Sequence, residues 1–308
     1  MKKTLLLLAL ASASSWGAAL VLQTDFGTKD GAVAAMKGVA FGVDGQLPIF
    51  DLTHDIPPYD LWQGGYRLFQ TYRYWPAGTV FVSVIDPGVG TERRSIVARS
   101  KSGHYFVSPD NGTLTLIADN DGIAALRQID ETKNRLAGSE KSYTFHGRDV
   151  YAYTGARLAA GKIKFEEVGP ELPVELVKIP YQRASLENGL IRGNIPVLDV
   201  QYGNVWTNIN EALLDAAGIK KDDWVCVEIR QGDRLKYVGT MPYKSSFGEV
   251  ETGKPLLYLN SLLQVSFALN MENFAAKNQV QSGADWSATV KACPAEDSGS
   301  APASHEGP

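Results

Sequence analysis

Short apolar runs alternate with stretches of helical periodicity in the first half of the chain. The apolar runs at residues 20–24, 49–50, 79–85 and 105–107 are typical of buried strands. Residues 32–43 are rich in alanine, and apolar residues recur at helical spacing over 61–72, after Asp60, which is a typical N-cap. A further helix is expected from about residue 150 to 160. This alternation predicts a mostly parallel α/β sheet.

The pattern changes in the second half of the chain. Short strand-like runs at residues 195–200, 224–230, 235–240 and 256–259 are separated by turns. This spacing is typical of a small antiparallel barrel or sandwich. We therefore expect an N-terminal α/β domain over residues 20–175, a linker with an edge strand over 176–190, and a small antiparallel C-terminal β-barrel domain over 191–291.

The two ends of the sequence differ from the domains between them. Lys2 and Lys3 precede a short apolar run and then small residues, which predicts a cleavable signal peptide over residues 1–18. The run is too short to span a bilayer, and a retained buried helix is the alternative. We expect an exported, periplasmic protein. Residues 292–308, rich in small and polar residues, predict a disordered tail.

Composition limits the classes of partner. With 308 residues, 44% hydrophobic content and 21% charged residues, the chain is an ordinary soluble protein long enough for two domains. Its formal net charge of −4 offers no basic footprint for nucleic acid and no polybasic membrane anchor. We therefore expect neither nucleic acid nor membrane as a partner. Export permits a disulfide between Cys226 and Cys293, but buried free cysteine is also common in apolar strands, so the pairing stays open.

Residues 83–93 contain the most informative motif, with the sequence SVIDPGVGTER. An apolar strand leads into Asp86 on a Pro-Gly-x-Gly turn, and Arg93 follows seven residues later. Ligands of open α/β sheets bind outside the carboxyl ends of the strands, so Asp86 is expected to face a pocket. A structural salt bridge between Asp86 and Arg93 is the alternative interpretation.

The sequence contains no motif typical of a dinucleotide, P-loop or metal site. Neither a G-x-G-x-x-G nor a G-x-x-x-x-G-K-[ST] motif is present, which disfavours dinucleotide and P-loop sites. The four histidines show no spacing typical of metal ligands. We therefore expect no metal site and no cofactor.

Four further motifs accompany the 83–93 segment: LQTDFG at residues 22–27, DLTH at 51–54, FHGRD at 145–149 and DVQYGN at 199–204. In this order, over residues 20–280, the set resembles the SAM hydroxide adenosyltransferase family. Its members are S-adenosyl-L-methionine (SAM) hydrolases related to the SAM-dependent fluorinase and chlorinase. The resemblance implies attack of water or hydroxide on the ribose C5′ of SAM, giving adenosine and methionine. It also implies a homotrimer whose sites lie between neighbouring subunits.

The resemblance implies roles for individual residues. Asp86, Arg93 and His146 match the family's catalytic Asp-Arg-His set, and Asp25 matches the aspartate that binds both ribose hydroxyls. The other substrate-binding matches are Tyr59, Phe145, Asp199, Tyr202, Asn204, Phe247, Ser261, Leu269 and Met271. The chain departs from the family pattern near residues 262–273, where Leu262 and Leu263 stand close to a position at which glycine is usual.

Two alternatives to hydrolysis follow from the same residues. The related halogenases have a tyrosine at the position of Asp86, and a carboxylate beside the nucleophile would repel a halide. The sequence therefore favours water over halide. An exported, non-catalytic nucleoside-binding protein is the second alternative, although binding alone would not require Asp86, Arg93 and His146 together.

Overall fold

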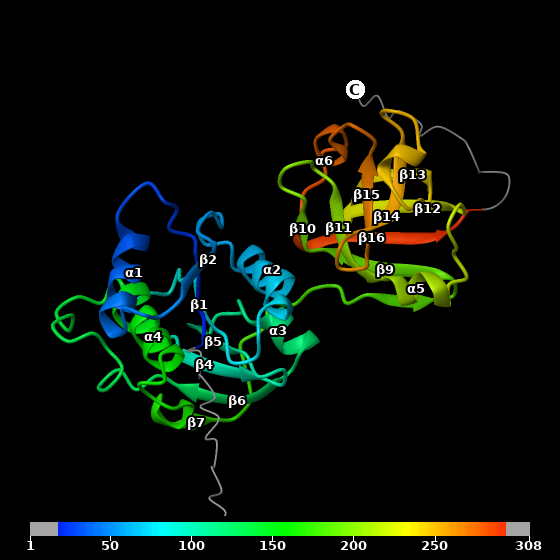
Figure 1. Ribbon diagram of the computed structural model, residues 1–308. Coiled ribbons are helices and arrows are strands. Elements are labelled where there is room, and N and C mark those ends of the chain that lie inside the picture. Colours follow the sequence, from blue (N-terminus) through cyan, green and yellow to red (C-terminus); the bar gives the residue numbers. More distant parts are fainter. Residues whose placement is uncertain (1–17, 294–308) are drawn as a thin grey trace, which may run out of the picture.

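The computed structural model describes residues 18–293, which form an N-terminal and a C-terminal domain (Figure 1). Residues 1–17 of the predicted signal peptide and 294–308 of the predicted tail lie outside this range. Within it, no helix is long and apolar enough to cross a membrane.

A seven-stranded sheet forms the centre of the N-terminal domain, in the order β2-β1-β3-β5-β4-β6-β7. The pairs β1–β2, β1–β3 and β3–β5 are parallel, whereas β4 is antiparallel to both β5 and β6, and β7 is antiparallel to β6. The predicted mostly parallel sheet is therefore confirmed. The strands are β1 (Leu20–Thr24), β2 (Ile49–Thr53), β3 (Val80–Val84), β4 (Ser95–Ser100), β5 (Tyr105–Pro109), β6 (Ile123–Gln128) and β7 (Glu171–Leu172).

Helices cover both faces of this sheet. Leu20 and Leu22 of β1 pack with Met36 of α1 and Ala156 of α4, while Val21 faces the other side, toward α2 and α3. Successive residues of a strand point to opposite faces, which explains this division. The helices are α1 (Ala32–Val43), α2 (Leu61–Thr71), η1 (Tyr72–Tyr74), α3 (Thr115–Asn120), the π-helical η2 (Gly147–Ala152), α4 (Tyr153–Ala159) and η3 (Phe165–Glu167).

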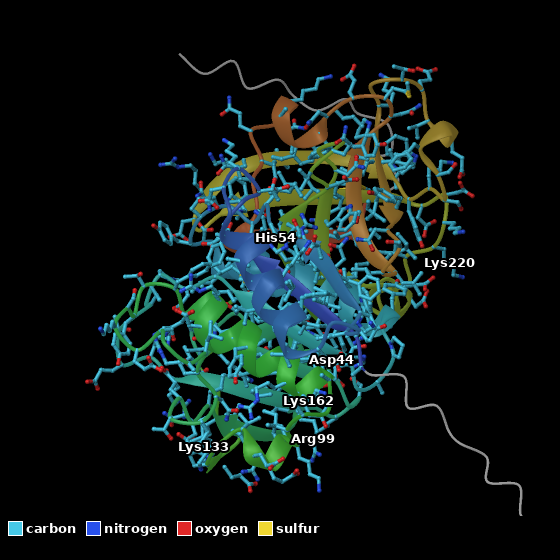
Figure 2. All side chains as sticks on the ribbon, turned by 60° about the vertical axis from the view of Figure 1, so that its left-hand side comes forward. Asp44, His54, Arg99, Lys133, Lys162 and Lys220 are labelled. Atoms are coloured by element: carbon cyan, nitrogen blue, oxygen red, sulfur yellow. A yellow bond between two sulfur atoms is a disulfide. The ribbon has the colours of Figure 1, made fainter. Side chains whose placement is uncertain are left out.

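The parallel strands end at one edge of the sheet and bring distant motifs together there. Asp25 follows β1, His54 follows β2 and Asp86 follows β3, and Arg93 lies just before the start of the antiparallel β4. Figure 2 shows His54 on the side nearer the C-terminal domain, with Arg99 and Lys162 toward the opposite end of the N-terminal domain.

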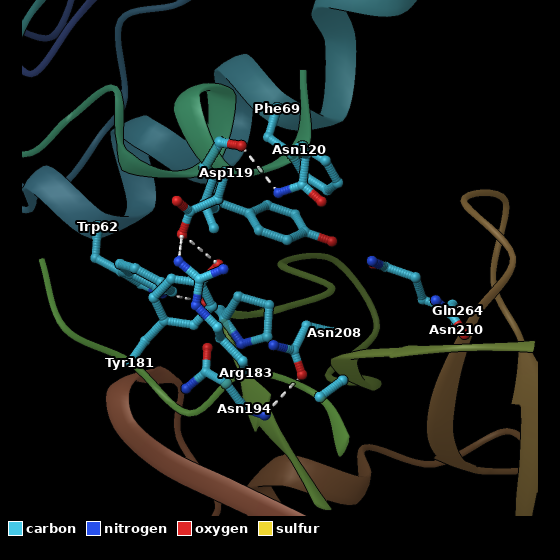
Figure 3. Close-up of a pocket in the computed structure, with 14 residues that line it drawn as sticks. Trp62, Phe69, Asp119, Asn120, Tyr181, Arg183, Asn194, Asn208, Asn210 and Gln264 are labelled. Atoms are coloured by element: carbon cyan, nitrogen blue, oxygen red, sulfur yellow. Dashed lines mark hydrogen bonds and ion pairs between the residues drawn. The ribbon is translucent and has the colours of Figure 1, made fainter. Parts of the chain in front are cut away.

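The two domains contact each other through α2, α3 and the connecting segment. Trp62 of α2 donates a hydrogen bond from Nε1 to the Pro196 carbonyl oxygen, at 3.0 Å. A cavity of about 270 Å³ lies between the domains. At its wall the Asp119 carboxylate accepts from Tyr181 at 3.0 Å and from Arg183 at 2.8 Å (Figure 3). These bonds attach the connecting segment to the N-terminal domain.

The C-terminal domain consists of two antiparallel sheets, as its turn-rich sequence predicts. Their orders are β10-β11-β15-β14 and β13-β12-β16-β9-β8. The edge strand β8 lies within the predicted linker 176–190, where an edge strand was expected. The strands are β8 (Ser185–Glu187), β9 (Leu190–Ile195), β10 (Val197–Leu198), β11 (Val205–Asn210), β12 (Trp224–Gln231), β13 (Arg234–Pro242), β14 (Pro255–Leu259), β15 (Gln264–Leu269) and β16 (Gly283–Ala292), with the short helices α5 (Glu211–Ala216), η4 (Phe247–Glu249) and α6 (Phe274–Lys277).

The prediction of one strand over residues 195–200 is wrong. The chain leaves the five-stranded sheet at Ile195 and enters the four-stranded sheet at Val197, with Pro196 between them. Proline has no N–H for a strand ladder, so the pairing breaks there. Asp199 and Val200 lie beyond β10, in the turn that leads to β11.

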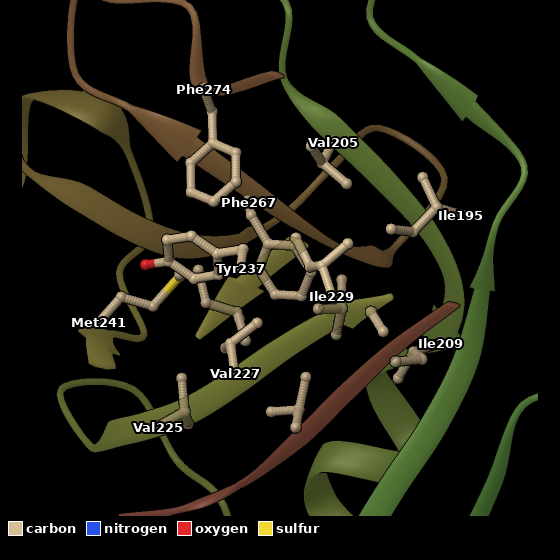
Figure 4. Packing of buried hydrophobic residues seen from close by; sticks show 14 of the residues in the cluster. Ile195, Val205, Ile209, Val225, Val227, Ile229, Tyr237, Met241, Phe267 and Phe274 are labelled. Carbon is tan, nitrogen blue, oxygen red and sulfur yellow. The ribbon is translucent and has the colours of Figure 1, made fainter. Parts of the chain in front are cut away.

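The hydrophobic core of the C-terminal domain lies between its two sheets (Figure 4). Val225, Val227 and Ile229 of β12 contribute alternate side chains to it. The Phe274 ring lies 5.0 Å from the Tyr237 ring, measured between centroids.

A disulfide between Cys226 and Cys293 answers the question that the sequence left open. It joins β12 to the residue after β16, two strands that pair side by side. Because β16 ends at Ala292, the folded domain reaches Cys293, two residues further than the predicted domain end.

Candidate functional site

The Asp86 carboxylate is held by Arg93 in a bidentate ion pair. Arg93 Nε lies 2.9 Å from Oδ1 and 3.1 Å from Oδ2, and Nη2 lies 2.5 Å from Oδ2. The Asp86 side chain is only 5% exposed and the Arg93 side chain 11%. Among residues 18–293, Oδ1 accepts from Nε alone, so it retains an acceptor position for a further donor such as water.

The turn that carries Asp86 depends on Gly90. The Val89 N–H donates to the Asp86 carbonyl at 3.2 Å. Gly90 has φ +76°, and a Cβ there would lie 3.1 Å from the Tyr143 carbonyl oxygen. Glycine therefore permits both the left-handed backbone and the close approach of the loop that precedes His146.

His146 contacts the same guanidinium. Arg93 Nη2 lies 2.9 Å from His146 Nδ1. Arginine has no acceptor, so Nδ1 accepts in this shorter contact, and a neutral ring then carries its hydrogen on Nε2. Burial lowers the pKa of His146, and the nearby Arg93 and Arg135 cations lower it as well. The carboxylates of Glu131 and Asp86 raise it, but the net direction is downward. This direction of the pKa and the acceptor role of Nδ1 both favour the neutral ring.

Two supporting residues were not identified from the sequence. Arg93 Nη1 donates to Ser95 Oγ at 2.9 Å, and Ser95 Oγ lies 3.1 Å from the Tyr151 hydroxyl. The Arg93 guanidinium also lies over the Tyr151 ring. Burial raises the pKa of Tyr151, which stays protonated. Their only sequence signal is proximity: Ser95 is two residues after Arg93, and Tyr151 is five after His146.

Asp25 lies beyond β1, beside Tyr59. The Tyr59 N–H donates to Asp25 Oδ2 at 2.8 Å, and Tyr59 is a 70% exposed residue with a left-handed backbone, φ 67°. Phe145 packs against Phe26, with 5.8 Å between the ring centroids. These predicted binding residues therefore surround the same strand end.

His54, from the 51–54 motif, supports this region. Its Nδ1 lies 2.8 Å from Thr24 Oγ1 and its Nε2 lies 3.0 Å from Asp51 Oδ1. Its carbonyl oxygen accepts from the Gly27 N–H at 2.8 Å. The buried ring thus joins the ends of β1 and β2 and holds the turn that carries Asp25.

All the predicted binding residues of the C-terminal domain line one cavity of about 870 Å³. Asn204 Nδ2 donates to Asp199 Oδ2 at 3.2 Å. Gly203, with φ +71°, leaves room for Asn273, which any Cβ at this position would strike. The predicted residues in the lining are Asp199, Tyr202, Asn204, Phe247, Ser261, Leu269 and Met271.

The departures from the family pattern coincide with unusual backbone. Leu263 has φ 56° and Met271 has φ 61°, so both are left-handed where glycine would be unstrained. Met271 is 85% exposed. Phe247 packs against Tyr258, with ring centroids 4.8 Å apart.

The structure thus assembles the predicted residues in two groups. Arg93 contacts both Asp86 and His146, whereas the cavity of the C-terminal domain is lined by residues of that domain alone. Among residues 18–293, no group of three or more His, Cys, Asp or Glu side chains is arranged to hold a metal ion.

Comparisons with known proteins identify the family of the chain. The sequence models of the SAM hydroxide adenosyltransferase N-terminal and C-terminal domains match residues 20–169 and 193–287. An (R)-S-adenosyl-L-methionine hydrolase of Methanocaldococcus jannaschii is 35% identical, over 80% of this chain and 87% of the relative. A fluorinase of an Actinoplanes species is 28% identical, over 86% and 95%. The crystal structure of an uncharacterized conserved protein from Thermotoga maritima superposes with a TM-score of 0.80 at 30% identity, covering 88% and 99%.

Proposed function

Because the chain belongs to the SAM hydroxide adenosyltransferase family, we propose that it hydrolyses SAM to adenosine and L-methionine. The observation that carries the proposal is the contact of Arg93 with both Asp86 and His146. Relatives 35% identical to this chain are named (R)-S-adenosyl-L-methionine hydrolase, which supports the same reaction.

In the proposed reaction a water oxygen attacks C5′ of the ribose in line with the sulfonium sulfur. The C5′–O bond forms, the C5′–S bond breaks, and its electron pair stays on sulfur, giving the neutral thioether of methionine. The leaving group therefore needs no acid. The water must lose a proton, and it must be held in line, which positioning by the site can supply.

Asp86, Arg93 and His146 have separate roles in this reaction. Asp86 Oδ1, with an acceptor position free, binds the water and takes its proton. Arg93 fixes the carboxylate, and neutral His146 fixes Arg93 by accepting from Nη2. A protonated His146 could not accept that bond, so His146 is a positioning residue and Asp86 the proton acceptor. This reaction uses no metal and no cofactor.

Substrate binding is assigned to both groups of residues. Asp25 accepts hydrogen bonds from the two ribose hydroxyls, with Tyr59 and Phe145 beside the sugar and the sulfonium. In the C-terminal cavity, Asp199, Asn204 and Ser261 bind the methionine end. The adenine is packed by Tyr202 and Phe247 and contacted by the backbone of Leu269 and Met271.

We propose further that the protein is a homotrimer whose sites lie between subunits. The catalytic group and the C-terminal cavity belong to different domains, and large residues assigned to substrate binding in both domains are exposed: Tyr59 at 70%, Tyr202 at 67% and Met271 at 85%. Exposed apolar surface of this kind commonly marks an interface. A neighbouring copy that brings its cavity to Asp86 would cover these side chains.

Water is favoured over halide as the nucleophile. The Asp86 carboxylate can accept a hydrogen bond from water, whereas a halide ion has no hydrogen to donate. The fluorinases among the relatives are also less similar, at 28% identity.

Export to the periplasm is part of the proposal. The disulfide between Cys226 and Cys293 fits an oxidising compartment, and Lys2 and Lys3 with the apolar run after them fit a signal peptide. Natively expressed protein should lack Met1 and appear in the periplasmic fraction; retained Met1 would contradict export.

The direct test is product analysis with purified protein in ¹⁸O-labelled water. Adenosine carrying label at its 5′ hydroxyl, together with methionine, is expected without added metal. Unlabelled adenosine would exclude direct displacement by water. A 5′-halonucleoside as the main product at high chloride or fluoride would favour the halogenase reaction, and binding without turnover would favour a nucleoside-binding protein. Activity lost with EDTA and restored by zinc or magnesium would contradict the metal-free reaction.

A further inference from the structure

Arg135 is a buried arginine next to the catalytic group that the sequence motifs did not include. Its side chain is only 6% exposed, and its Nη1 donates to Glu131 Oε2 at 2.8 Å. Nη1 also lies 3.4 Å from His146 Nε2. Arg135 is thus the second guanidinium that faces the His146 ring, on the side opposite Arg93.

The same guanidinium holds the loop that leads into His146. Arg135 Nη2 donates to the carbonyl oxygens of Ser139 and Ser142, at 3.2 and 2.6 Å, and Nε donates to Ser139 Oγ at 3.1 Å. The guanidinium also lies over the Tyr143 ring, 4.6 Å from its centroid. One side chain therefore fixes most of the segment between residues 139 and 143.

This loop in turn packs against the turn that carries Asp86. The Tyr143 carbonyl oxygen approaches Gly90 closely, and the Tyr143 ring contacts the His146 ring edge to face. A displacement of the loop would therefore move His146 and the 86–90 turn together.

We propose that Arg135 is a positioning residue of this site, which fixes the His146 loop and keeps the imidazole neutral so that Nδ1 can accept from Arg93. An imidazolium at this place would direct an N–H at each of the two guanidiniums, which is unfavourable on both sides. The proposal rests on the proposed function for its effect on turnover. Its effect on the titration of His146 is independent of any reaction.

The charged groups around His146 set the sign of each expected effect. Burial lowers the pKa of the ring; the cations Arg93 and Arg135 lower it further, and the carboxylates Glu131 and Asp86 raise it. Removing the Arg135 charge should therefore raise the pKa of His146, and removing the Glu131 charge should lower it. A disordered loop would shift the pKa of His146 in the same direction in both variants, whereas an electrostatic effect shifts it in opposite directions. Glu131→Gln also leaves the loop contacts of Arg135 in place.

The experiment is an NMR titration of the histidine rings in the full chain, with His146→Gln to assign the His146 signal. We expect a higher pKa for His146 in Arg135→Gln, a lower one in Glu131→Gln, and little change in Arg135→Lys, which keeps the charge. Arg99→Gln, at the other end of the domain (Figure 2), is the matched control and should titrate as wild type.

Turnover supplies the second measurement. Arg135→Gln should lower kcat by about 10- to 100-fold, as expected for misplaced catalytic groups, with KM changed less than about threefold. The acid limb of its pH–rate profile should move to higher pH, because the pKa of His146 is expected to rise. Arg135→Lys should restore that limb and only part of kcat, because an ammonium cannot make all the loop bonds.

Unchanged titration of His146 in Arg135→Gln would overturn the proposal, as would a shift of the same sign as in Glu131→Gln. If Arg135→Gln does not fold, Arg135→Lys decides, because an ammonium cannot make all the loop bonds of Arg135 and wild-type kcat in that variant would overturn the positioning role. If the wild type does not hydrolyse SAM, the proposed function fails, whereas the titration still reports on Arg135.

Discussion

Arg93 holds the Asp86 carboxylate with two of its nitrogens, Nε at 2.9 Å from Oδ1 and Nη2 at 2.5 Å from Oδ2. A salt bridge with a purely structural role would have the same geometry. What distinguishes this pair is its place beyond the carboxyl end of β3, where Nη2 also meets His146. The predictions below separate the structural role from the catalytic one.

Asp86→Asn should abolish turnover while leaving binding nearly intact. The amide keeps the size of the carboxylate but cannot take the proton of water, and loss of a general base costs about 10²–10⁴ in rate. Calorimetry should find SAM affinity within about tenfold of wild type, equivalent to roughly 1.4 kcal/mol. Asp44→Asn, at the C-cap of α1 and away from His54 (Figure 2), is the matched control. Near-normal turnover in Asp86→Asn would return the pair to a structural role.

Asp25→Ala should show the converse effect. Each hydrogen bond to a charged group contributes roughly 1.5–3 kcal/mol, so losing the two ribose bonds should weaken binding of both SAM and adenosine by at least about 100-fold. Methionine affinity should not change, because methionine has no ribose. Equal weakening for methionine would show that Asp25 supports the fold and not the diol. Calorimetry with the three ligands measures the difference.

The sequence predicted elements whose local pattern matches their environment. The helix over residues 32–43 agrees with α1, and the Asp60 side chain accepts from the Gln63 N–H at 2.9 Å, as expected of an N-cap. Asp86 and Arg93 could be paired from spacing because only a short turn separates them. The parallel strands β1 and β3 are buried throughout, so their apolar runs were clear.

Relationships between distant segments could not be predicted from local patterns. His146 is 53 residues from Arg93, and only the family resemblance associated them. Arg135 belongs to no motif, and its contacts depend on the path of the 139–143 loop. The disulfide closes 67 residues of chain, and its formation depends on the pairing of β12 with β16. The break at Pro196 was missed because flanking apolar residues suggested a continuous strand.

Removing the disulfide should lower stability and leave catalysis largely unchanged. A bridge that spans 67 residues restricts the unfolded chain by roughly 4 kcal/mol in the chain-entropy model. Cys226→Ser with Cys293→Ser should therefore lower Tm by several degrees, measured by calorimetry, with kcat within about twofold. Wild type under reducing agent should fall to the same Tm. A Tm identical to that of oxidised wild type would show that the bridge does not contribute.

Mixed oligomers test whether each site combines two subunits. Asp86→Asn damages only the N-terminal group and Asn204→Ala only the C-terminal cavity, so each variant alone should be inactive or nearly so. Coexpressed with different tags and purified as mixed trimers, the two variants should recover about a third of wild-type sites, because in each mixed ring one subunit contact of three joins an intact N-terminal group to an intact C-terminal cavity. Coexpression of Asp86→Asn with His146→Ala, both in the N-terminal group, should recover nothing. If each site were built within one chain, the first mixture would also stay inactive, since every chain would carry one defect. Light scattering on the same samples measures whether the species is a trimer.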